Sequence, residues 1–371
     1  MSNHVLENSH GPLKRTPQAR YFVDSEYFKT EMQQWFADRW VYVGRAEELP
    51  NPGDYILRTI AGESILITRG NDCKVRSFFN ICTHRGTVLV ESENTPTRSC
   101  QFSCPYHSWT FDCQGHLIGA PGMKDVDGFC EQNWGLRPID CEIWAGFIFL
   151  NLKQNPPPLS EFLADLPEKF SNWPIEEMRI GERVEYHVQA NWKRIIQNYS
   201  ECLHCPSVHP ALARLSPPTS GENEPANLCY AGGRMSLNEG IASMTTSGST
   251  NRPLISSLSE SQKRHVYYYA WLPNLLLSLH PDYVMTHRIE PLTNNQTRIV
   301  CEWLFEKSTM ASTGFQSEDA VAFWDMTNKQ DWHVSELTQR GLSSRAYRPG
   351  PYSNREELLY DLDQILLPKE D

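Results

Sequence analysis

Short apolar runs, separated by Gly and Pro, dominate the first half of the chain after its opening segment. They include DYILRTI (54–60), SILITR (64–69), VRSFFNI (75–81) and FIFLNL (147–152). Runs of this length, rich in β-branched and aromatic residues and bounded by turn residues, are typical of strands. The pattern predicts a small antiparallel β domain over residues 40–155.

The segments on either side of this domain have a different pattern. Asp24 precedes SEYFKTEMQQWFAD (25–38), which reads as a capped helix, so we assign 1–39 to an N-terminal arm and helix. The proline-rich stretch at 155–162 reads as a stiff connection. We place a domain boundary there, with a second domain over 156–371.

The second domain alternates long strands with helices. A helix is expected from Ser317 to a stop at Gly341. The polar segment 243–261 is expected to be a mobile loop, and Ser353 with Glu356 has the spacing of a capping box at the last helix. The expected strands are HVYYYAWL (265–272), NLLLSL (274–279), YVMTHRIEPL (283–292) and RIVCEWLFE (298–306). A sheet wrapped against a long helix is implied.

Composition narrows the function. The formal net charge of −11 argues against a nucleic-acid surface, and 371 residues suffice for two domains. The longest apolar run, 143–152, is too short to cross a bilayer and no signal-peptide pattern is present, so we expect a cytoplasmic protein. Eleven cysteines at irregular spacing favour metal ligands over paired disulfides in a reducing compartment. No glycine-rich nucleotide fingerprint is visible, so we expect no nicotinamide or flavin site in this chain.

Two loops of the β domain each contain one cysteine and one histidine. CTHRG supplies Cys82 and His84, and CPYHSW supplies Cys104 and His107. Two thiolates and two imidazoles suit either zinc or an iron–sulfur cluster of the Rieske type. Zinc fingers favour a cysteine pair and a histidine pair, whereas here the two residue types are mixed in each loop. This arrangement resembles the Rieske [2Fe-2S] fold of oxygenases.

A second cluster of candidate ligands lies in QNYSECLHCPSVHP (197–210). Glu201 and His204 are three positions apart and would share a helix face, while Pro206 would break the helix and let His209 turn back. Two histidines and a carboxylate form the facial triad of non-haem iron oxygenases. The C-x2-C pair in the same stretch leaves two further interpretations, a redox dithiol or a zinc knuckle; packing behind the ligands is a third.

Together these motifs resemble Rieske non-haem iron oxygenase alpha subunits over almost the whole chain. The resemblance implies an α+β fold, with an N-terminal Rieske [2Fe-2S] domain and a C-terminal helix-grip catalytic domain that binds Fe(II). It implies Asp331, which lies two helical turns before Gln339 in a Gln-Arg-Gly run, as the third iron ligand; Asp325 is the alternative. It also implies that Glu201 carries electrons between a cluster histidine and an iron-ligand histidine.

The same resemblance carries expectations about activity and partners. The glutamate at position 201 is similar to that of choline, carnitine and glycine betaine monooxygenases. We expect a homotrimer that uses O2 and electrons from a separate NAD(P)H-dependent reductase or ferredoxin to hydroxylate a small organic substrate. A quaternary amine would undergo N-demethylation, an aromatic acid is the alternative substrate, and a bare Rieske electron carrier is the alternative class.

The strand 265–272 bears on the substrate. Its alternation places Tyr267, Tyr269 and Trp271 on one face, where their rings could surround a quaternary ammonium group by cation–π attraction. The competing interpretation is a well-packed sheet, in which these rings are simply core.

Overall fold

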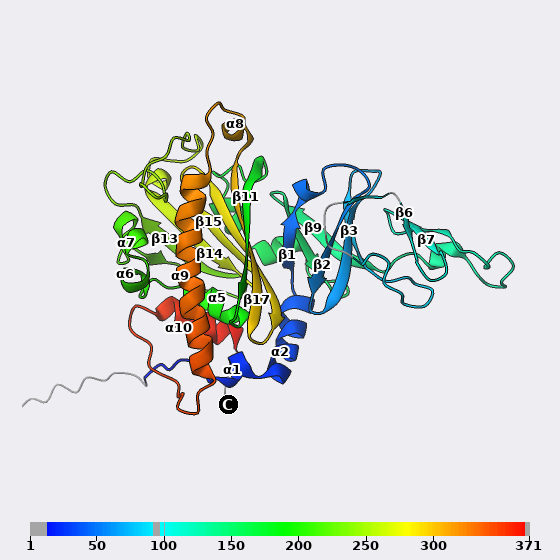
Figure 1. Cartoon of the computed structure of the whole chain (residues 1–371), viewed down its shortest axis with the longest axis horizontal. Coiled ribbons are helices and arrows are strands. Elements are labelled where there is room, and N and C mark those ends of the chain that lie inside the picture. Colours follow the sequence, from blue (N-terminus) through cyan, green and yellow to red (C-terminus); the bar gives the residue numbers. More distant parts are fainter. Residues whose placement is uncertain (1–12, 92–96, 100, 368–371) are drawn as a thin grey trace, which may run out of the picture.

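Two lobes build the molecule (Figure 1). The structure, a computed structural model, describes residues 13–91, 97–99 and 101–367. Strands of the first half form the smaller lobe, and the larger lobe contains a broad sheet with the longest helix across it. The expected fold class, a β domain followed by a sheet against a long helix, is confirmed. The boundaries 1–39, 40–155 and 156–371 stay predictions, and each of these ranges includes residues outside the described part.

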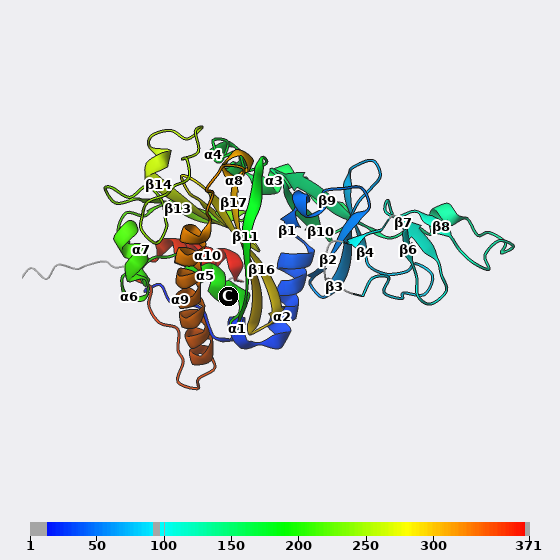
Figure 2. The same ribbon diagram turned by 45° about the horizontal axis from the view of Figure 1, so that its top comes forward.

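The smaller lobe consists of two antiparallel sheets. The larger has the order β1-β10-β9-β4-β3-β2-β5 and the smaller has the order β6-β7-β8. Figure 2 shows the smaller sheet at the end of the molecule farthest from α9. The strands are β1 (Val41–Arg45), β2 (Asp54–Ile60), β3 (Glu63–Arg69), β4 (Val75–Phe79), β5 (Thr97–Arg98), β6 (Gln101–Ser103), β7 (Thr110–Asp112), β8 (Leu117–Gly119), β9 (Pro138–Trp144) and β10 (Phe147–Asn151).

Two hairpins of this lobe turn through the same dipeptide. Ala61 and Gly62 join β2 to β3 with φ angles of 51° and 85°, and Ala145 and Gly146 join β9 to β10 with φ angles of 47° and 81°. Two consecutive residues in the left-handed region form the type I′ turn, whose twist matches that of the strands. Short local turns therefore fix the register of both pairs.

The N-terminal helix is confirmed, with an irregularity. The Asp24 side chain accepts hydrogen bonds from the backbone N–H groups of Glu26 and Tyr27, which makes it the N-cap of α2 (Ser25–Glu31). A preceding turn, α1 (Arg20–Val23), and a π-helical continuation, η1 (Met32–Ala37), complete the segment. The cap thus fixes where the helix starts, as the sequence predicts.

The larger lobe is built on one antiparallel sheet of order β11-β17-β16-β15-β14-β13-β12. All four strands expected between 265 and 306 are present. The strands are β11 (Met178–Val188), β12 (Glu222–Asn223), β13 (Tyr230–Ser236), β14 (His265–Trp271), β15 (Leu275–Leu279), β16 (Val284–Thr293) and β17 (Gln296–Glu306). The helices are α3 (Leu159–Leu163), α4 (Leu166–Lys169), α5 (Trp192–Tyr199), α6 (Cys205–Val208), α7 (Pro210–Leu215), α8 (Lys307–Met310), α9 (Glu318–Leu342) and α10 (Glu357–Leu366).

Both faces of this sheet are covered. On one face, α9 contributes Phe323, Trp324 and Trp332 to a core shared with β16 and β17. On the other face, residues such as Trp271 pack with Phe149 of the smaller lobe, with ring centroids 5.5 Å apart. The sheet is therefore a wall between α9 and the N-terminal lobe.

Three local expectations for the larger lobe need correction. The segment 243–261 is anchored, because Met244 and Ile255 are buried and Arg252 pairs with the buried carboxylate of Asp282 at 2.9 Å. Helix α9 runs past Gly341 to Leu342. The predicted capping-box residues 353 and 356 do bond to each other, but in a turn that precedes α10.

Candidate functional site

The two Cys-His loops of the smaller lobe have the same backbone hydrogen bonds. In the first loop, Cys82 N donates to Thr87 O at 2.8 Å and Gly86 N donates to Cys82 O at 2.9 Å. In the second loop, Cys104 N donates to Trp109 O at 2.7 Å and Ser108 N donates to Cys104 O at 3.0 Å. Gly86 and Ser108 both have positive φ angles, 74° and 59°. The loops are thus two copies of one turn.

The sulfur atoms receive backbone N–H groups in the same repeated way. Cys82 accepts from the N–H groups of the second and third residues after it, and so does Cys104. Such N–H donors stabilise a thiolate and tune an iron–sulfur cluster. Both cysteines are buried. Burial nevertheless raises the pKa of Cys82, whereas burial at Cys104 is outweighed by the N–H donors, which lower its pKa. The turn geometry therefore presents two sulfur atoms in the same way to a metal.

The two histidines of these loops lie side by side. The ring centroids of His84 and His107 are 4.7 Å apart, and His84 stacks on Trp109 at 4.6 Å. His84 Nδ1 is buried and has no hydrogen-bond partner in the described part of the chain. A buried ring nitrogen without a partner is costly unless a ligand occupies it. Two thiols and two imidazoles at one spot fit a [2Fe-2S] cluster with mixed ligands.

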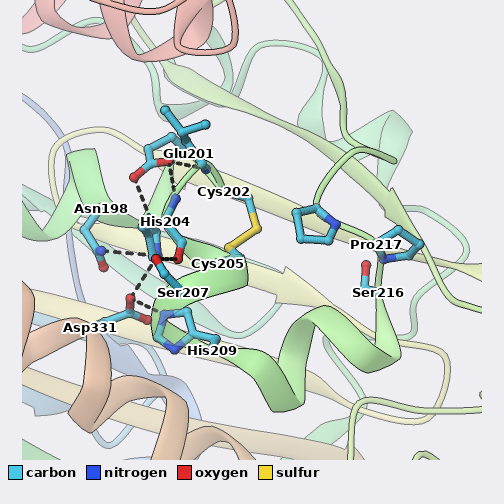
Figure 3. Close-up of a disulfide and its surroundings, with 12 residues drawn as sticks. Asn198, Glu201, Cys202, His204, Cys205, Ser207, His209, Ser216, Pro217 and Asp331 are labelled. Carbon is cyan, nitrogen blue, oxygen red and sulfur yellow. Dashed lines mark hydrogen bonds and ion pairs between the residues drawn. A yellow bond between two sulfur atoms is a disulfide. The ribbon is translucent and has the colours of Figure 1, made fainter.

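The second group of candidate ligands lies between α9, which carries Asp331, and the segment that carries His204 and His209 (Figure 3). His204, His209 and Asp331 each offer one ligand atom, and these atoms all lie within 4.8 Å of one another. Asp331 Oδ1 is 2.7 Å from His209 Nε2 and 3.2 Å from His204 Nε2. Two imidazoles and a carboxylate, facing one point, fit a non-haem iron.

A separate acceptor orients each of these histidines. Glu201 Oε1 is 2.5 Å from His204 Nδ1, and Gln330 Oε1 is 2.7 Å from His209 Nδ1. Since an oxygen at Nδ1 holds the proton there, the Nε2 lone pair of each ring points at the shared centre. Metal-binding histidines are typically fixed in this way.

The charges of the group favour a cation at its centre. Burial lowers the pKa of His204, but Asp331 and Glu201 outweigh it and raise that pKa to about 9. Burial raises the pKa of Asp331, but His204 and His209 outweigh it and hold that pKa below its ordinary value. A metal ion that binds here therefore displaces a proton from His204.

A cavity of about 410 Å³ adjoins these ligands. His204, His209 and Asp331 line it on one side. Its aromatic and apolar walls include Tyr199 of α5, Leu212 of α7, Met235 of β13, Tyr268 of β14, Trp324 of α9 and Leu358 of α10. A space of this volume holds a small organic molecule.

Comparison with known proteins decides the family. Residues 175–366 match the family described as the ring hydroxylating alpha subunit (catalytic domain), and residues 39–130 match the Rieske [2Fe-2S] domain. The chain belongs to the Rieske oxygenase alpha subunits. The alpha subunit is therefore an oxidoreductase, and the expected cofactors of the family, a [2Fe-2S] cluster and a non-haem iron, are confirmed.

Several relatives of the alpha subunit have named substrates. The glycine betaine monooxygenase oxygenase subunit of Pseudomonas aeruginosa (strain UCBPP-PA14) is 28% identical over 365 residues, covering 91% of this chain and 84% of the relative. The carnitine monooxygenase oxygenase subunit of Escherichia coli (strain K12) is 35% identical over 197 residues, covering 53% of this chain and 52% of the relative.

Solved structures support the fold. The quaternary ammonium Rieske monooxygenase CntA in complex with L-carnitine superposes with a TM-score of 0.77 at 23% identity, covering 95% of this chain and 94% of that chain. Naphthalene 1,2-dioxygenase from Rhodococcus sp. also gives 0.77, at 19% identity with the same coverage. No helix in the described ranges has both the length and the apolar composition to span a bilayer.

The local structure around Glu201 differs from the expectation. Helix α5 ends at Tyr199, so Glu201 and His204 lie in a non-helical segment and share no helix face. Pro206 lies in the first turn of the next helix, α6, and the chain turns again at His209, between α6 and α7. The prediction that Pro206 breaks a helix is wrong: the helix ends before Glu201, and Pro206 helps to start the next one. Glu201 still reaches His204 because its carboxylate accepts hydrogen bonds from the backbone of the turn.

The structure distinguishes the two aspartates of α9. Asp331 meets both histidines, whereas Asp325 accepts a hydrogen bond from the Tyr186 hydroxyl at 3.0 Å and pairs with Lys329 at 2.6 Å. Asp325 is thus engaged elsewhere on the helix, and Asp331 is the better candidate.

The expected substrate residues lie on the wrong face of the sheet. Tyr269 donates a hydrogen bond to Glu224, Trp271 stacks on Phe162, and Tyr267 packs on the ring of Trp173. All three belong to the core between the sheet and the N-terminal lobe, and none lines the cavity. Their neighbour on the opposite face, Tyr268, does line it. The competing interpretation, a packed sheet, is the correct one for these three rings.

Cys202 and Cys205 form a disulfide. The expectation of unpaired thiols is wrong for this pair, although the half-cystines do pack against the core behind the ligands. The sequence motifs do not mark Gln330, Tyr199 and Trp324 as site residues. Trp324 is seven positions before Asp331 and so lies on the same helix face, which is the signal that could have identified it.

Proposed function

We propose that this alpha subunit hydroxylates a small quaternary ammonium compound, and that hydroxylation of an N-methyl group releases formaldehyde by N-demethylation. The observation that carries the proposal is the aromatic wall of the cavity beside His204, His209 and Asp331. The named substrates of the relatives, glycine betaine and carnitine, are of the same chemical class.

The wall consists of three rings. The centroid of Tyr268 is 6.1 Å from that of Tyr199 and 6.3 Å from that of Trp324. Each well-placed ring attracts a desolvated cation by about 0.5–2 kcal/mol. His280 lies behind this wall, 5.4 Å from Trp324, and burial lowers its pKa well below the ordinary value. It therefore stays neutral and does not repel a cation.

We assign the metal ligands by the fit of the residues to each group. Cys82, His84, Cys104 and His107 would hold the [2Fe-2S] cluster, and His204, His209 and Asp331 would hold the iron. When bound, the cluster supplies single electrons and the iron supplies the site where O2 is reduced. The protein orients the imidazoles through Glu201 and Gln330, and the cavity places a bound substrate beside them.

Glu201 also suits the bridging role. One carboxylate oxygen binds His204, and its side chain lines the cavity rather than the core. We propose that the second contact is made with a cluster histidine of a neighbouring subunit in a trimer, and that a separate reductase or ferredoxin loads the cluster. A cytoplasmic location stays a prediction.

An aromatic acid is the second candidate substrate. Arg355 lines the cavity, and its guanidinium donates a hydrogen bond to the backbone oxygen of Pro218 at 3.1 Å. Within the described part of the chain, this bond to a backbone oxygen is the hydrogen bond that the Arg355 guanidinium makes. A guanidinium of this kind can bind a substrate carboxylate.

Oxygen uptake distinguishes the two substrates. The holoenzyme with a surrogate reductase would be tested on trimethylammonium compounds and on aromatic acids. We expect uptake coupled to formaldehyde release with an amine. Hydroxylation of aromatic acids alone, with every amine inert, would overturn the proposal.

Iron counting tests the assignment and the activity class. The holoenzyme should contain about three irons per chain, whereas an electron carrier would contain about two. Asp331→Ala should lose the mononuclear iron and keep the Rieske spectrum. Asp325→Ala is the matched control on the same helix, and it should keep all the iron. Full iron and turnover in Asp331→Ala would show that the ligand assignment is wrong.

A further inference from the structure

We infer that Cys202 and Cys205 form a redox-active pair, and that its dithiol and disulfide states control how firmly His204 is held at the iron site. The inference rests on the proposed assignment of His204 as a ligand. It starts from position: the disulfide closes a ring that contains Leu203 and His204, and Glu201 lies directly before it (Figure 3).

The segment inside the ring joins α5 to α6 and has no regular secondary structure. Hydrogen bonds hold His204 itself: its ring contacts Glu201 and Asp331, and its carbonyl oxygen accepts from the N–H groups of Ser207 and Val208. Before His204 the support is weaker, because Leu203 is 39% exposed and donates its N–H only to the Glu201 carboxylate. The cross-link therefore adds a covalent restraint to the hydrogen bonds that position His204.

The disulfide can be reached by small reagents. Both half-cystines line the cavity, and Cys202 is only partly buried, whereas Cys205 is 5% exposed. Exposed thiols elsewhere, such as Cys73, have no partner cysteine within bonding distance in the described ranges. Cys202 is thus the sulfur that an external thiol attacks, and Cys205 is the buried partner that closes or leaves the bond.

The chemistry is thiol–disulfide exchange. In oxidation, the Cys202 thiolate attacks one sulfur of a small disulfide and expels one thiol; Cys205 then attacks the mixed disulfide and expels the second thiol. Two protein thiols lose two electrons and two protons, and the reagent is reduced to two thiols. A small dithiol reverses both steps and leaves as its cyclic disulfide.

The oxidised state matches the ligand geometry. The ligand atoms of His204, His209 and Asp331 lie within 4.8 Å of one another while the disulfide is closed. Opening the ring frees the segment between α5 and α6, so His204 loses part of its preorganisation. We expect the closed form to retain iron and the open form to release it about tenfold faster, because a cross-link mainly restricts the disordered alternatives of its loop.

The test uses the holoenzyme under anaerobic conditions, treated with dithiothreitol or with 2-hydroxyethyl disulfide. Differential alkylation and peptide mass spectrometry report the state of Cys202 and Cys205, and a ferrous chelator reports the release of mononuclear iron. The visible spectrum of the cluster is the internal reference. We expect reversible conversion and about tenfold faster iron release from the reduced form.

Two variants distinguish an effect of the Cys202–Cys205 pair from a general effect of the two reagents on the protein. Cys202→Ser/Cys205→Ser should release iron at the rate of the reduced wild type and ignore both reagents. Cys73→Ser, in a surface turn, should respond as the wild type does. Two alkylated thiols after oxidation would overturn the inference. Equal iron release from both wild-type states would overturn it too, and that measurement needs no variant to fold. An error in the ligand assignment itself would be seen separately, as full mononuclear iron in Asp331→Ala.

Discussion

The amide of Gln330 offers a direct test of how the candidate iron site is organised. Gln330 Oε1 lies 2.7 Å from His209 Nδ1, and His209 is 2% exposed, so Gln330 is the acceptor that this buried ring nitrogen has in the described part of the chain. Gln330→Ala leaves the buried Nδ1–H without a partner. The ring is then free to turn, and Nε2 is no longer held toward Asp331.

The size of the effect follows from the buried hydrogen bond. Leaving a buried donor unsatisfied costs about 1–3 kcal/mol, and each 1.4 kcal/mol is about a tenfold change in an equilibrium constant. Loss of such an orienting group typically weakens metal affinity about 10–100-fold. We therefore expect Gln330→Ala to bind the mononuclear iron about 10–100-fold more weakly, with the Rieske spectrum unchanged.

Competition with a ferrous chelator measures this affinity directly, with cluster absorbance as the reference. Gln330→Glu keeps an acceptor oxygen and should retain most of the iron. Gln339→Ala is the matched control: Gln339 is also on α9 and accepts from Asn191 N at 3.1 Å, far from either histidine. Wild-type iron affinity in Gln330→Ala would refute the orienting role. Equal iron loss in Gln339→Ala would assign the effect to a disturbed helix instead.

Three further predictions concern substrate, electron transfer and stability. Tyr268→Leu and Trp324→Leu should each raise KM for a trimethylammonium substrate roughly 2- to 30-fold. Tyr267→Leu, on the other face of the sheet, should leave KM unchanged. Equal KM values in all three variants would contradict a role of the aromatic wall in binding the cation. Glu201→Gln should keep its iron but slow oxidation of the reduced cluster in single turnover, and an unchanged rate would remove the bridging role. Burial raises the pKa of Glu48, but Arg58, Arg288 and Arg183 lower it to about 2 from an ordinary 4.5. Because the folded pKa is the lower one, Glu48 stabilises the fold above pH 4.5 and loses this effect toward pH 2. Glu48→Gln should cost on the order of 3 kcal/mol in urea unfolding at pH 7, and a cost that stayed constant down to pH 3 would contradict the sign.

The Cys-His loops can be recognised from the sequence because their signals are local. Cys82 with His84 and Cys104 with His107 lie in single turns, so spacing alone indicates that each loop presents a thiol and an imidazole. The hairpin turns and the Asp24 cap are equally local. Each of these features depends on residues within about five positions of each other, which is the range over which turn and cap chemistry acts.

The face of β14 could not be predicted in the same way. Alternation correctly separates Tyr267, Tyr269 and Trp271 from Tyr268, but both faces of this central strand meet a core. A strand buried on both sides has no polar face to mark the solvent or the cavity. Only the position of α9, fixed by contacts from another part of the chain, decides which face lines the cavity.

The remaining differences between the sequence-based predictions and the structure arise from contacts between residues that are distant in sequence. Gln330 and His209 are 121 positions apart, so no spacing rule links them. The C-x2-C pair allows a disulfide, a dithiol or a zinc site on spacing alone; the choice depends on the path of the turn after Tyr199, where the helix ends before Glu201.

One helix, α9, contributes residues to the cavity wall and to the group of candidate iron ligands. Trp324 lines the cavity, Asp331 meets both histidines and Gln330 orients His209, all within two turns of α9. The segment between α5 and α6 supplies His204 and Glu201, and its only covalent restraint in the described part is the disulfide. The rigid helix therefore fixes one carboxylate and one wall, while the less ordered segment sets the opposite imidazole. Changes at Gln330 and at Cys202 act first on different imidazoles, His209 and His204, but both imidazoles contact Asp331 and face one metal position, so their effects on iron retention should be coupled. A double variant, Gln330→Ala with Cys202→Ser, tests this coupling, because a combined loss equal to the sum of the two single losses would mean that the two imidazoles respond independently.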